Sequence, residues 1–307
     1  MKVLDLFCGG GGLSYGFREA GYNVTGADLS ESAAATFKSN HIGGFIKVNL
    51  GSDTITGNYD VIVGGPPCRP WSTMNVTKRK SKHEDYKLLG RFFDHVKANL
   101  PAAFLLENVP AIKNDPVLRS KSRELALKYG YKIAADVLSY IDYGAPTVRK
   151  RFFLFGLADG KDGKFFNLIS RHRVRKCKTV KDAIWDLRNV KYGAYMDHEW
   201  PMLKTISKYL NFYNTGKYGW KILEWNKPAP SFGNIMKTYI LHPNSFSENG
   251  TTRAISVREA LRLMGFPDGF RFGKGEGLSS RYQIVADSVS PKFSFAAAES
   301  IKKIFGE

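Results

Sequence analysis

The first half of the 307-residue chain alternates between apolar runs of strand length and amphipathic stretches of helix length. The apolar runs are KVLDLF, NVTGADL, FIKVNL, YDVIVGG, AAFLLENV, YKIAADVLSY and RFFLFGLA. Amphipathic stretches extend from Leu13 to Ala20, from Ser30 to Ser39 and from Asp85 to Asn99. This alternation predicts an α/β fold with a doubly wound, mostly parallel sheet and helices on both faces. In such a fold, ligands bind beyond the carboxyl ends of the strands.

The alternation stops near residue 160, which predicts a change of domain. Residues 161–250 are rich in Lys, Asn, Tyr and Trp and contain only short apolar runs, so we expect a second, smaller domain there. Residues 251–307 follow as a C-terminal segment that returns to the domain formed by residues 1–160. In this last segment, ISVREALRLMGFPDGF predicts a short helix that ends at Gly-Phe-Pro, and SPKFSFAAAESIKKIF predicts a helix on the sheet.

The charge of the chain indicates a polyanionic partner. Lysine and arginine total 46 against 28 acidic residues, a formal net charge of +18. Two runs concentrate this charge, KRKSK at 78–82 and RHRVRKCK at 171–178. Short basic runs are often only solvated surface, but an excess over the whole chain favours nucleic acid, since each phosphate contact releases counterions. No amphipathic helix stands out to support binding to an anionic membrane.

The cysteine content favours a reducing, cytoplasmic setting. Cys8, Cys68 and Cys177 form an odd, sparse set without CxxC spacing, so we expect neither a disulfide framework nor a metal site. No run of about 18 apolar residues predicts a membrane span. The opening MKVLDLFCGG enters a strand directly and lacks the layout of a signal peptide.

The stretch GPPCRPWS at 65–72 fixes the backbone around a single cysteine. Proline restricts its own φ and the residue before it, so Pro66 and Pro67 stiffen the approach to Cys68. Because this loop follows the strand that ends at Val63, it lies at the ligand-binding edge of the sheet. Cys68 is therefore a candidate nucleophile, or else a small buried residue in a turn.

A glycine-rich loop, Gly9 to Gly12, separates the first strand from the first helix. Backbone amides at such a junction can approach a ligand closely. Asp28, at the end of the second strand, is placed to accept hydrogen bonds from ribose hydroxyls, or else to cap the next helix, which Ser30 could cap instead. Asn49, after the third strand, could contact an adenine edge or satisfy a turn. These features predict an adenosine-containing cofactor, either a dinucleotide or S-adenosylmethionine.

Several motifs along the chain occur together, in order, in one enzyme family. The glycine-rich loop, Pro-Pro-Cys and then Glu107-Asn108-Val109 resemble the cytosine-C5 DNA methyltransferases of bacterial and archaeal restriction-modification systems. APTVRKRFF at 145–153, RAISVREALRLMGFPDGF at 253–270 and QIVADSVSP at 283–291 look like later segments of the same family. The resemblance spans nearly the whole chain except about residues 160–250.

The resemblance implies a DNA (cytosine-5-)-methyltransferase that flips a cytosine out of a short DNA site and methylates its carbon 5. Cys68 would add to carbon 6 as a thiolate, and Glu107 would protonate ring nitrogen 3 or bond to it. Arg151 would hold the ring carbonyl, while Arg149 would support the loop or a phosphate. The sequence names no residue for the base that removes the carbon-5 proton, and a bound water is one candidate.

The cofactor implied is S-adenosyl-L-methionine, bound by residues 1–160, with Phe7 near its adenine and Asp28 on its ribose. The full set of expected cofactor-binding residues is Phe7, Gly9, Gly11, Asp28, Leu29, Asn49, Leu50, Pro67 and Ser288. The expected DNA-binding residues are Arg69, Ser72, Lys78, Arg79 and Lys80, in a loop that closes over double-stranded DNA. The target-recognition domain at 161–250 would read the major groove, through Arg171, Arg173, Arg175 and Lys176 or through Lys217–Trp220.

Five positions depart from the family pattern, and they bear on cofactor binding and on the anchoring of the loop. Thr147 and Arg69 each replace a usual glutamine, Asn49 replaces an aspartate, and Ala286-Asp287 replaces Gly-Asn. The cysteine, the glutamate and the second arginine are all retained, so we expect activity.

Three other functions compete with this interpretation. An RNA cytosine methyltransferase would share the fold and bind a tRNA-like shape. A non-catalytic DNA-binding relative is disfavoured by the intact Cys68 and Glu107. A dinucleotide-dependent oxidoreductase would leave Pro-Pro-Cys, Glu-Asn-Val and the net charge of +18 unexplained. For the methyltransferase we expect a monomer and a cognate restriction endonuclease that shares its site without a stable complex.

Overall fold

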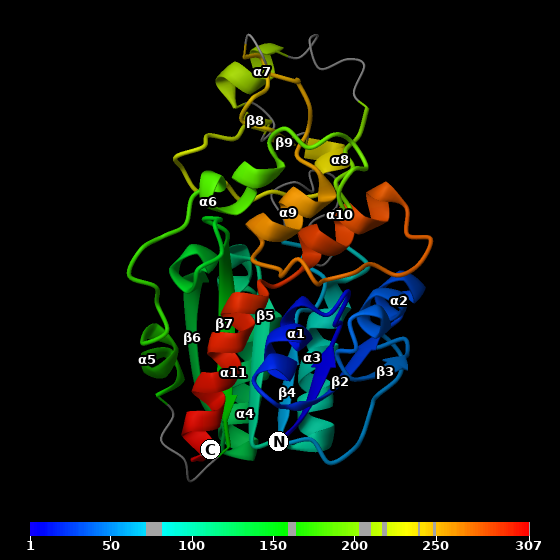
Figure 1. Ribbon diagram of the computed structural model, residues 1–307. Coiled ribbons are helices and arrows are strands. Elements are labelled where there is room, and N and C mark those ends of the chain that lie inside the picture. The colour runs from blue at the N-terminus through cyan, green and yellow to red at the C-terminus, as the bar shows by residue number, and fades with distance from the viewer. Residues whose placement is uncertain are drawn as a thin grey trace.

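The computed structural model describes residues 1–71, 82–158, 164–202, 210–216, 220–238, 240–247 and 250–306. A sheet flanked by helices forms one end of the molecule, and short helices and strands form the other (Figure 1). In the described part of the chain, no helix combines the length and apolar character that a membrane span requires.

The sheet has seven strands in the order β3-β2-β1-β4-β5-β7-β6. Their bounds are Lys2–Leu6 (β1), Asn23–Asp28 (β2), Gly44–Lys47 (β3), Val61–Gly64 (β4), Ala103–Asn108 (β5), Lys132–Ser139 (β6) and Lys150–Leu157 (β7). Strands β1 to β5 pair in parallel, whereas β7 runs antiparallel to both β5 and β6. All seven predicted strands are confirmed, as is the mostly parallel α/β sheet.

Both faces of the sheet are covered, because side chains alternate along each central strand. In β4, Val61 and Val63 join one core cluster, whereas Ile62 joins the other. The first cluster lies under α1 (Gly12–Glu19), α2 (Glu31–Ser39) and α11 (Pro291–Phe305), and the second under α3 (Tyr86–Asn99) and α4 (Pro116–Tyr129). Helix α11 lies beside α1 in Figure 1, and Ser294 donates a hydrogen bond to the carbonyl of Leu13.

The predicted helices over 13–20, 30–39 and 85–99 correspond to α1, α2 and α3. The short helix of the C-terminal segment is α9 (Val257–Leu263), and the helix that returns to the sheet is α11. Among the described helices, α4 and α10 (Leu278–Asp287) were not predicted, although both are at least ten residues long.

Short elements connect β7 to α9 along the chain. They are α5 (Phe165–Ser170), α6 (Val180–Ile184), α7 (Leu210–Thr215), α8 (Ile235–Thr238), β8 (Lys221–Ile222) and β9 (Ile240–Leu241). Helix α5 packs on α11, while α9 packs on both α6 and α10 (Figure 1). The division of the chain at residues 160 and 250 stays a prediction.

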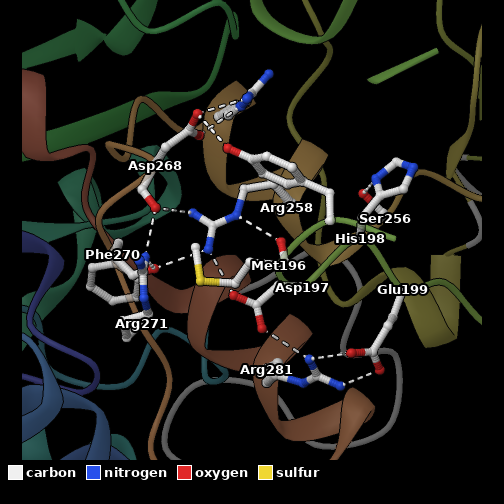
Figure 2. A network of polar contacts seen from close by, with 12 residues as sticks. Met196, Asp197, His198, Glu199, Ser256, Arg258, Asp268, Phe270, Arg271 and Arg281 are labelled. Carbon is white, nitrogen blue, oxygen red and sulfur yellow. Dashed lines mark hydrogen bonds and ion pairs between the residues drawn. The ribbon is translucent and has the colours of Figure 1, made fainter. Parts of the chain in front are cut away.

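A buried polar network joins this region to α9 and α10 (Figure 2). Asp197 bridges two arginines: Oδ2 accepts from Arg258 at 2.7 Å and Oδ1 from Arg281 at 3.0 Å. Arg258 is fully buried and also donates to the carbonyl of Phe270 at 3.0 Å. Arg281 continues to Glu199 at 2.7 Å. The network therefore fixes the segment around Asp197 against both helices.

Candidate active site

The loop that carries Cys68 is fastened to the end of the neighbouring strand. Strand β4 ends at Gly64, and the Asn108 amide at the end of β5 donates to the carbonyl of Pro66 at 2.9 Å. A Cβ on Gly65 would stand 2.8 Å from Glu107 Oε2, so only glycine allows this close approach. The Pro-Pro-Cys loop and Glu107 therefore meet at the carboxyl edge of the sheet.

Glu107 forms an ion pair with Arg151 in which Arg151 Nε lies 2.9 Å from Glu107 Oε1. Strand β7 begins at this edge because it runs antiparallel to β5, which brings Arg151 to the carboxylate. Burial raises the pKa of Glu107, while the positive charges of Arg151 and Arg149 act in the opposite direction. A raised pKa makes the protonated carboxyl, a hydrogen-bond donor, more accessible near neutral pH.

Cys68 is half-buried, and burial raises the pKa of its thiol. Arg151 favours the thiolate, whereas the charges of Glu107 and Asp287 oppose it. Cys68 is therefore protonated near neutral pH. More positive charge nearby, or less negative charge, would favour the thiolate.

Arg149 is buried and holds together segments that are distant in the sequence. Its guanidinium donates to the carbonyl of Phe232 at 2.9 Å and to the carbonyl of Ala286. Nearby, Thr147 Oγ1 donates to the carbonyl of Pro230 at 3.3 Å. Burial and the neighbouring Arg151 lower the pKa of Arg149 to about 10. These contacts suit the loop-supporting role considered for Arg149.

The glycine-rich loop meets Asp28 at the end of β2. Asp28 Oδ2 accepts from the amide of Gly9 at 3.0 Å, and Oδ1 accepts from the amide of Ser30 at 2.9 Å. Ser30 caps α2, because its Oγ accepts a hydrogen bond from the amide of Ala33 at 3.2 Å. The side chain of Asp28 is therefore not needed as the cap of this helix. Phe7 has a φ of 59°, a left-handed conformation that is rare for a bulky residue and frequent at functional sites.

The residues around Cys68 and those of the glycine-rich loop line one cavity. Its volume of about 500 Å³ is typical of small-molecule sites. Of the residues predicted to bind cofactor or catalyse, those that line it are Phe7, Gly9, Asp28, Leu29, Asn49, Leu50, Pro67, Cys68, Glu107, Arg149, Arg151 and Ser288. Gly11 does not line it: with a φ of 87°, it faces Ile42, whose Cδ1 lies 2.4 Å from where a Cβ would be.

Comparison with known proteins decides among the possible functions of this cavity. The family described as C-5 cytosine-specific DNA methylase matches residues 1–303. The chain belongs to this family. The methylase is 30% identical to the type II methyltransferase M.MthTI of Methanothermobacter thermautotrophicus, over 99% of this chain and 97% of that protein. It is 28% identical to M.NgoPII of Neisseria gonorrhoeae, over 99% of this chain and 96% of that protein.

Solved structures show the same fold. A putative DNA modification methyltransferase encoded within an E. coli prophage superposes with a TM-score of 0.75, at 23% identity and full coverage of both chains. The Dnmt2 methyltransferase of S. pombe gives a TM-score of 0.74 at 18% identity, covering 99% of this chain and 98% of the other. The methylase is thus a DNA (cytosine-5-)-methyltransferase whose full-length relatives are type II methyltransferases, and the oxidoreductase interpretation is wrong.

The family uses S-adenosylmethionine, and the residues of the methylase fit that cofactor. The Asp28 carboxylate accepts two backbone amides and keeps lone pairs for hydroxyl groups. Leu29 is 59% exposed at the cavity wall, an apolar surface that a flat base can cover. Asn49 Oδ1 accepts from the amide of Gly51 at 3.0 Å. The side-chain oxygen therefore satisfies a turn, which was one of the two roles expected for Asn49.

Other polar residues of the cavity lay outside the sequence predictions. Asp5 is buried, accepts from Ser14 Oγ at 2.6 Å, and burial raises its pKa to about 7. Asp287, at the end of α10, was noted only as a departure from the family pattern, although it lines the cavity beside Gln283. The signal for Asp5 was a carboxylate within the apolar run from Val3 to Leu6.

The predicted DNA contacts are only partly within the described structure. Ser72, Lys78, Arg79 and Lys80 lie outside the described residues, as do Lys217, Tyr218 and Gly219. Arg69 is exposed at the cavity, with Nε 3.7 Å from Asp85 Oδ2. Just before the undescribed stretch, the indole of Trp71 donates to Asp115 at 2.8 Å, which anchors the loop behind Cys68. Arg171, Arg173, Arg175 and Lys176 are all exposed.

Proposed function

We propose that the methylase transfers a methyl group from S-adenosylmethionine to carbon 5 of a cytosine flipped out of double-stranded DNA, through a covalent bond between Cys68 and carbon 6. The observation that carries this proposal is the single cavity that holds Cys68, the Glu107–Arg151 pair and the glycine-rich loop. An extruded base and an adenosine cofactor could occupy its two ends together.

Residues at the glycine-rich end would hold the cofactor. Asp28 would accept from the ribose hydroxyls, Phe7 and Leu29 would cover the adenine, and the loop amides would face the methionine portion. When bound, S-adenosylmethionine supplies an electrophilic methyl group on a sulfonium. Placing this group and the base in one cavity converts an encounter in solution into a reaction within one complex.

Residues at the other end would activate the base. The Cys68 thiol gives its proton to solvent in the cavity, and the resulting thiolate sulfur forms a bond with carbon 6. The electron pair of the ring double bond then becomes available at carbon 5. Glu107, protonated as its raised pKa favours, stabilises this change by donating at ring nitrogen 3, and Arg151 donates to the ring carbonyl. Arg149 acts as a positioning residue through its two carbonyl contacts.

The surroundings of the cavity would bind the DNA. The net charge of +18 supplies electrostatic attraction, and Arg69, Ser72, Lys78, Arg79 and Lys80 are proposed to contact the backbone. Residues 161–250 are proposed as the target-recognition domain, with residues 1–160 and 251–307 forming the catalytic domain. We further propose a monomer in the cytoplasm that protects a short site against a restriction endonuclease without forming a stable complex with it.

Deamination-based sequencing of host DNA tests the proposal directly. Cells expressing the protein should contain protected cytosines at one short motif, and cells expressing Cys68→Ala should contain none. The matched control is Cys177→Ala, which removes an exposed thiol and should leave protection unchanged. A folded wild-type protein that binds S-adenosylmethionine but protects no cytosine would refute the DNA reaction, and RNA would be the next substrate to test.

A further inference from the structure

Four acidic side chains line the cavity: Asp5, Asp28, Glu107 and Asp287. The first three each contact the protein, through a serine hydroxyl, two backbone amides and an arginine respectively, although Asp5 Oδ1 is buried without a hydrogen-bond partner among the described residues. Asp287 is exposed, and its Oδ2 accepts from Gln283 Nε2 at 2.8 Å. Within the described residues, its Oδ1 has no hydrogen-bond partner. Asp287 therefore offers a free carboxylate oxygen to whatever occupies the cavity.

The backbone on both sides of Asp287 is fixed. On one side, the Arg149 guanidinium donates to the carbonyl of Ala286. On the other, a Cβ on Gly12 would stand 2.5 Å from the carbonyl oxygen of Val289 and 3.0 Å from Ser288 Cβ, so the chain lies tightly against the glycine-rich loop. Asp287 is thus held between the residues proposed to bind the base and those proposed to bind the cofactor.

Asp287 also acts on the two residues proposed to handle the base. Burial is the main reason for the raised pKa of Cys68, and the negative charges of Glu107 and Asp287 add to it. Burial likewise raises the pKa of Glu107, with Asp287 again contributing in that direction. Asp287 lines the same cavity as Cys68 and Glu107, and its charge acts on both groups.

The proposed reaction requires a proton acceptor at a defined moment. After methyl transfer, the Cys68 sulfur is bonded to carbon 6 and Glu107 is committed to ring nitrogen 3, so neither is free to take the carbon-5 proton. A neutral amide, the family's usual group at position 287, cannot serve as a base at neutral pH. The carboxylate of this chain can, if it reaches the proton directly or through one water.

We infer that Asp287 is a catalytic base that accepts the carbon-5 proton, an inference that rests on the proposed function. The C5–H bond breaks, and its electron pair forms the C5–C6 double bond. The C6–S bond breaks at the same time, and its electron pair leaves with Cys68 as a thiolate. The proton passes to Asp287 Oδ1 and then to solvent.

A single-turnover experiment separates this step from methyl transfer. DNA carrying tritium at carbon 5 of the target cytosine is mixed with enzyme and S-adenosylmethionine, and methylation and tritium release are followed together. In the wild-type enzyme the two should coincide. In Asp287→Asn, methylation should stay within a few-fold of wild type while tritium release slows about a hundredfold, the usual scale for loss of a general base. A denaturation-resistant protein–DNA adduct should accumulate.

Two further variants sharpen the result. In Asp287→Ala, formate should restore tritium release, whereas Asp136→Asn, at an exposed carboxylate on β6, should behave as wild type. Tritium release at the wild-type rate in Asp287→Asn would overturn the inference. So would an equal loss of both steps with weakened S-adenosylmethionine binding, which would make Asp287 a cofactor ligand. A wild-type enzyme that never methylates the DNA would instead refute the proposed function itself.

Discussion

The side-chain amide of Asn108 donates a 2.9 Å hydrogen bond to the carbonyl oxygen of Pro66 and so ties the last residue of β5 to the loop that carries Cys68. The carbonyl oxygen of Asn108's side chain also accepts from the amide of Val109 at 2.9 Å. Both contacts are local to the cavity, and Asn108 is itself buried. Asn108 therefore holds the loop of the proposed nucleophile against the strand that carries Glu107.

Asn108→Ala should therefore impair the cysteine step more than cofactor binding. The buried carbonyl of Pro66 loses its donor, which should cost about 1–3 kcal/mol in the free energy of unfolding. Adduct formation with DNA containing 5-fluorocytosine should slow by roughly tenfold to a hundredfold because Cys68 is no longer held in place. The control is Asn114→Ala, an exposed asparagine bonded to Arg119. Equal adduct rates in the two variants would contradict the prediction.

Gly65→Ala should damage the site sterically. The new Cβ would stand 2.8 Å from Glu107 Oε2, and Glu107 is held on its other oxygen by Arg151. We expect at least a tenfold fall in the methyl-transfer rate, since the carboxyl must move from its position. Gly90→Ala is the matched control, because a Cβ there meets nothing within 4 Å and the residue lies within helix α3. That variant should keep its activity and gain about 0.5–1 kcal/mol in stability.

Asp197→Asn should destabilise the network of Figure 2. The carboxylate is the shared partner of Arg258 and Arg281, and Arg258 is fully buried, so the change leaves a buried positive charge without its counterion. The free energy of unfolding should fall by about 3 kcal/mol, measured by chemical denaturation. Glu199→Gln removes a more exposed partner of Arg281 and should cost less than about 1 kcal/mol. Similar losses in both variants would argue against the shared-carboxylate account.

His242 should make stability depend on pH in the mildly acidic range. Burial lowers its pKa from 6.5 to about 4, and the amide of Asn244 donates to Nδ1, which requires the neutral ring. The unfolded chain therefore binds more protons than the folded one between these values, so stability falls as the pH drops from 6.5 towards 4. The loss should approach about 3 kcal/mol. His242→Gln should flatten this part of the curve, and an unchanged slope would refute the assignment.

The seven strands were predictable because each is a mostly apolar run bounded by turn residues. Their order in the sheet and the antiparallel direction of β7 were not part of the prediction. Helix α4 was harder to predict, since only Leu118 and Leu125 of its 14 residues are buried and its surface is mostly polar. In helix α10, Arg281 contacts the polar network and Gln283 lines the cavity. Because its polar residues do not all face solvent, the helix lacks the usual amphipathic pattern.

The candidate site followed from motifs, but its internal contacts did not. Cys68 and Glu107 were expected at one sheet edge because the Cys68 loop follows β4 and Glu107 lies at the carboxyl end of β5. The attachment of Arg149 to Phe232 and Ala286 spans 83 and 137 positions in the chain, beyond the reach of any local pattern. The raised pKa of Asp5 depends on complete burial, which strand periodicity alone does not determine.

Helices α10 and α11 have a consequence for the timing of synthesis. Residues of α10 form one wall of the cavity, and α11 packs on α1 immediately behind the glycine-rich loop. A nascent chain holds Cys68, Glu107 and Arg151 long before it holds these two helices. It can form neither the complete cavity nor the packing behind the loop until residues 278–305 have left the ribosome. A fragment released before residue 278 therefore carries Cys68, Glu107 and Arg151 without the wall of the cavity that α10 forms and without the packing of α11 on α1.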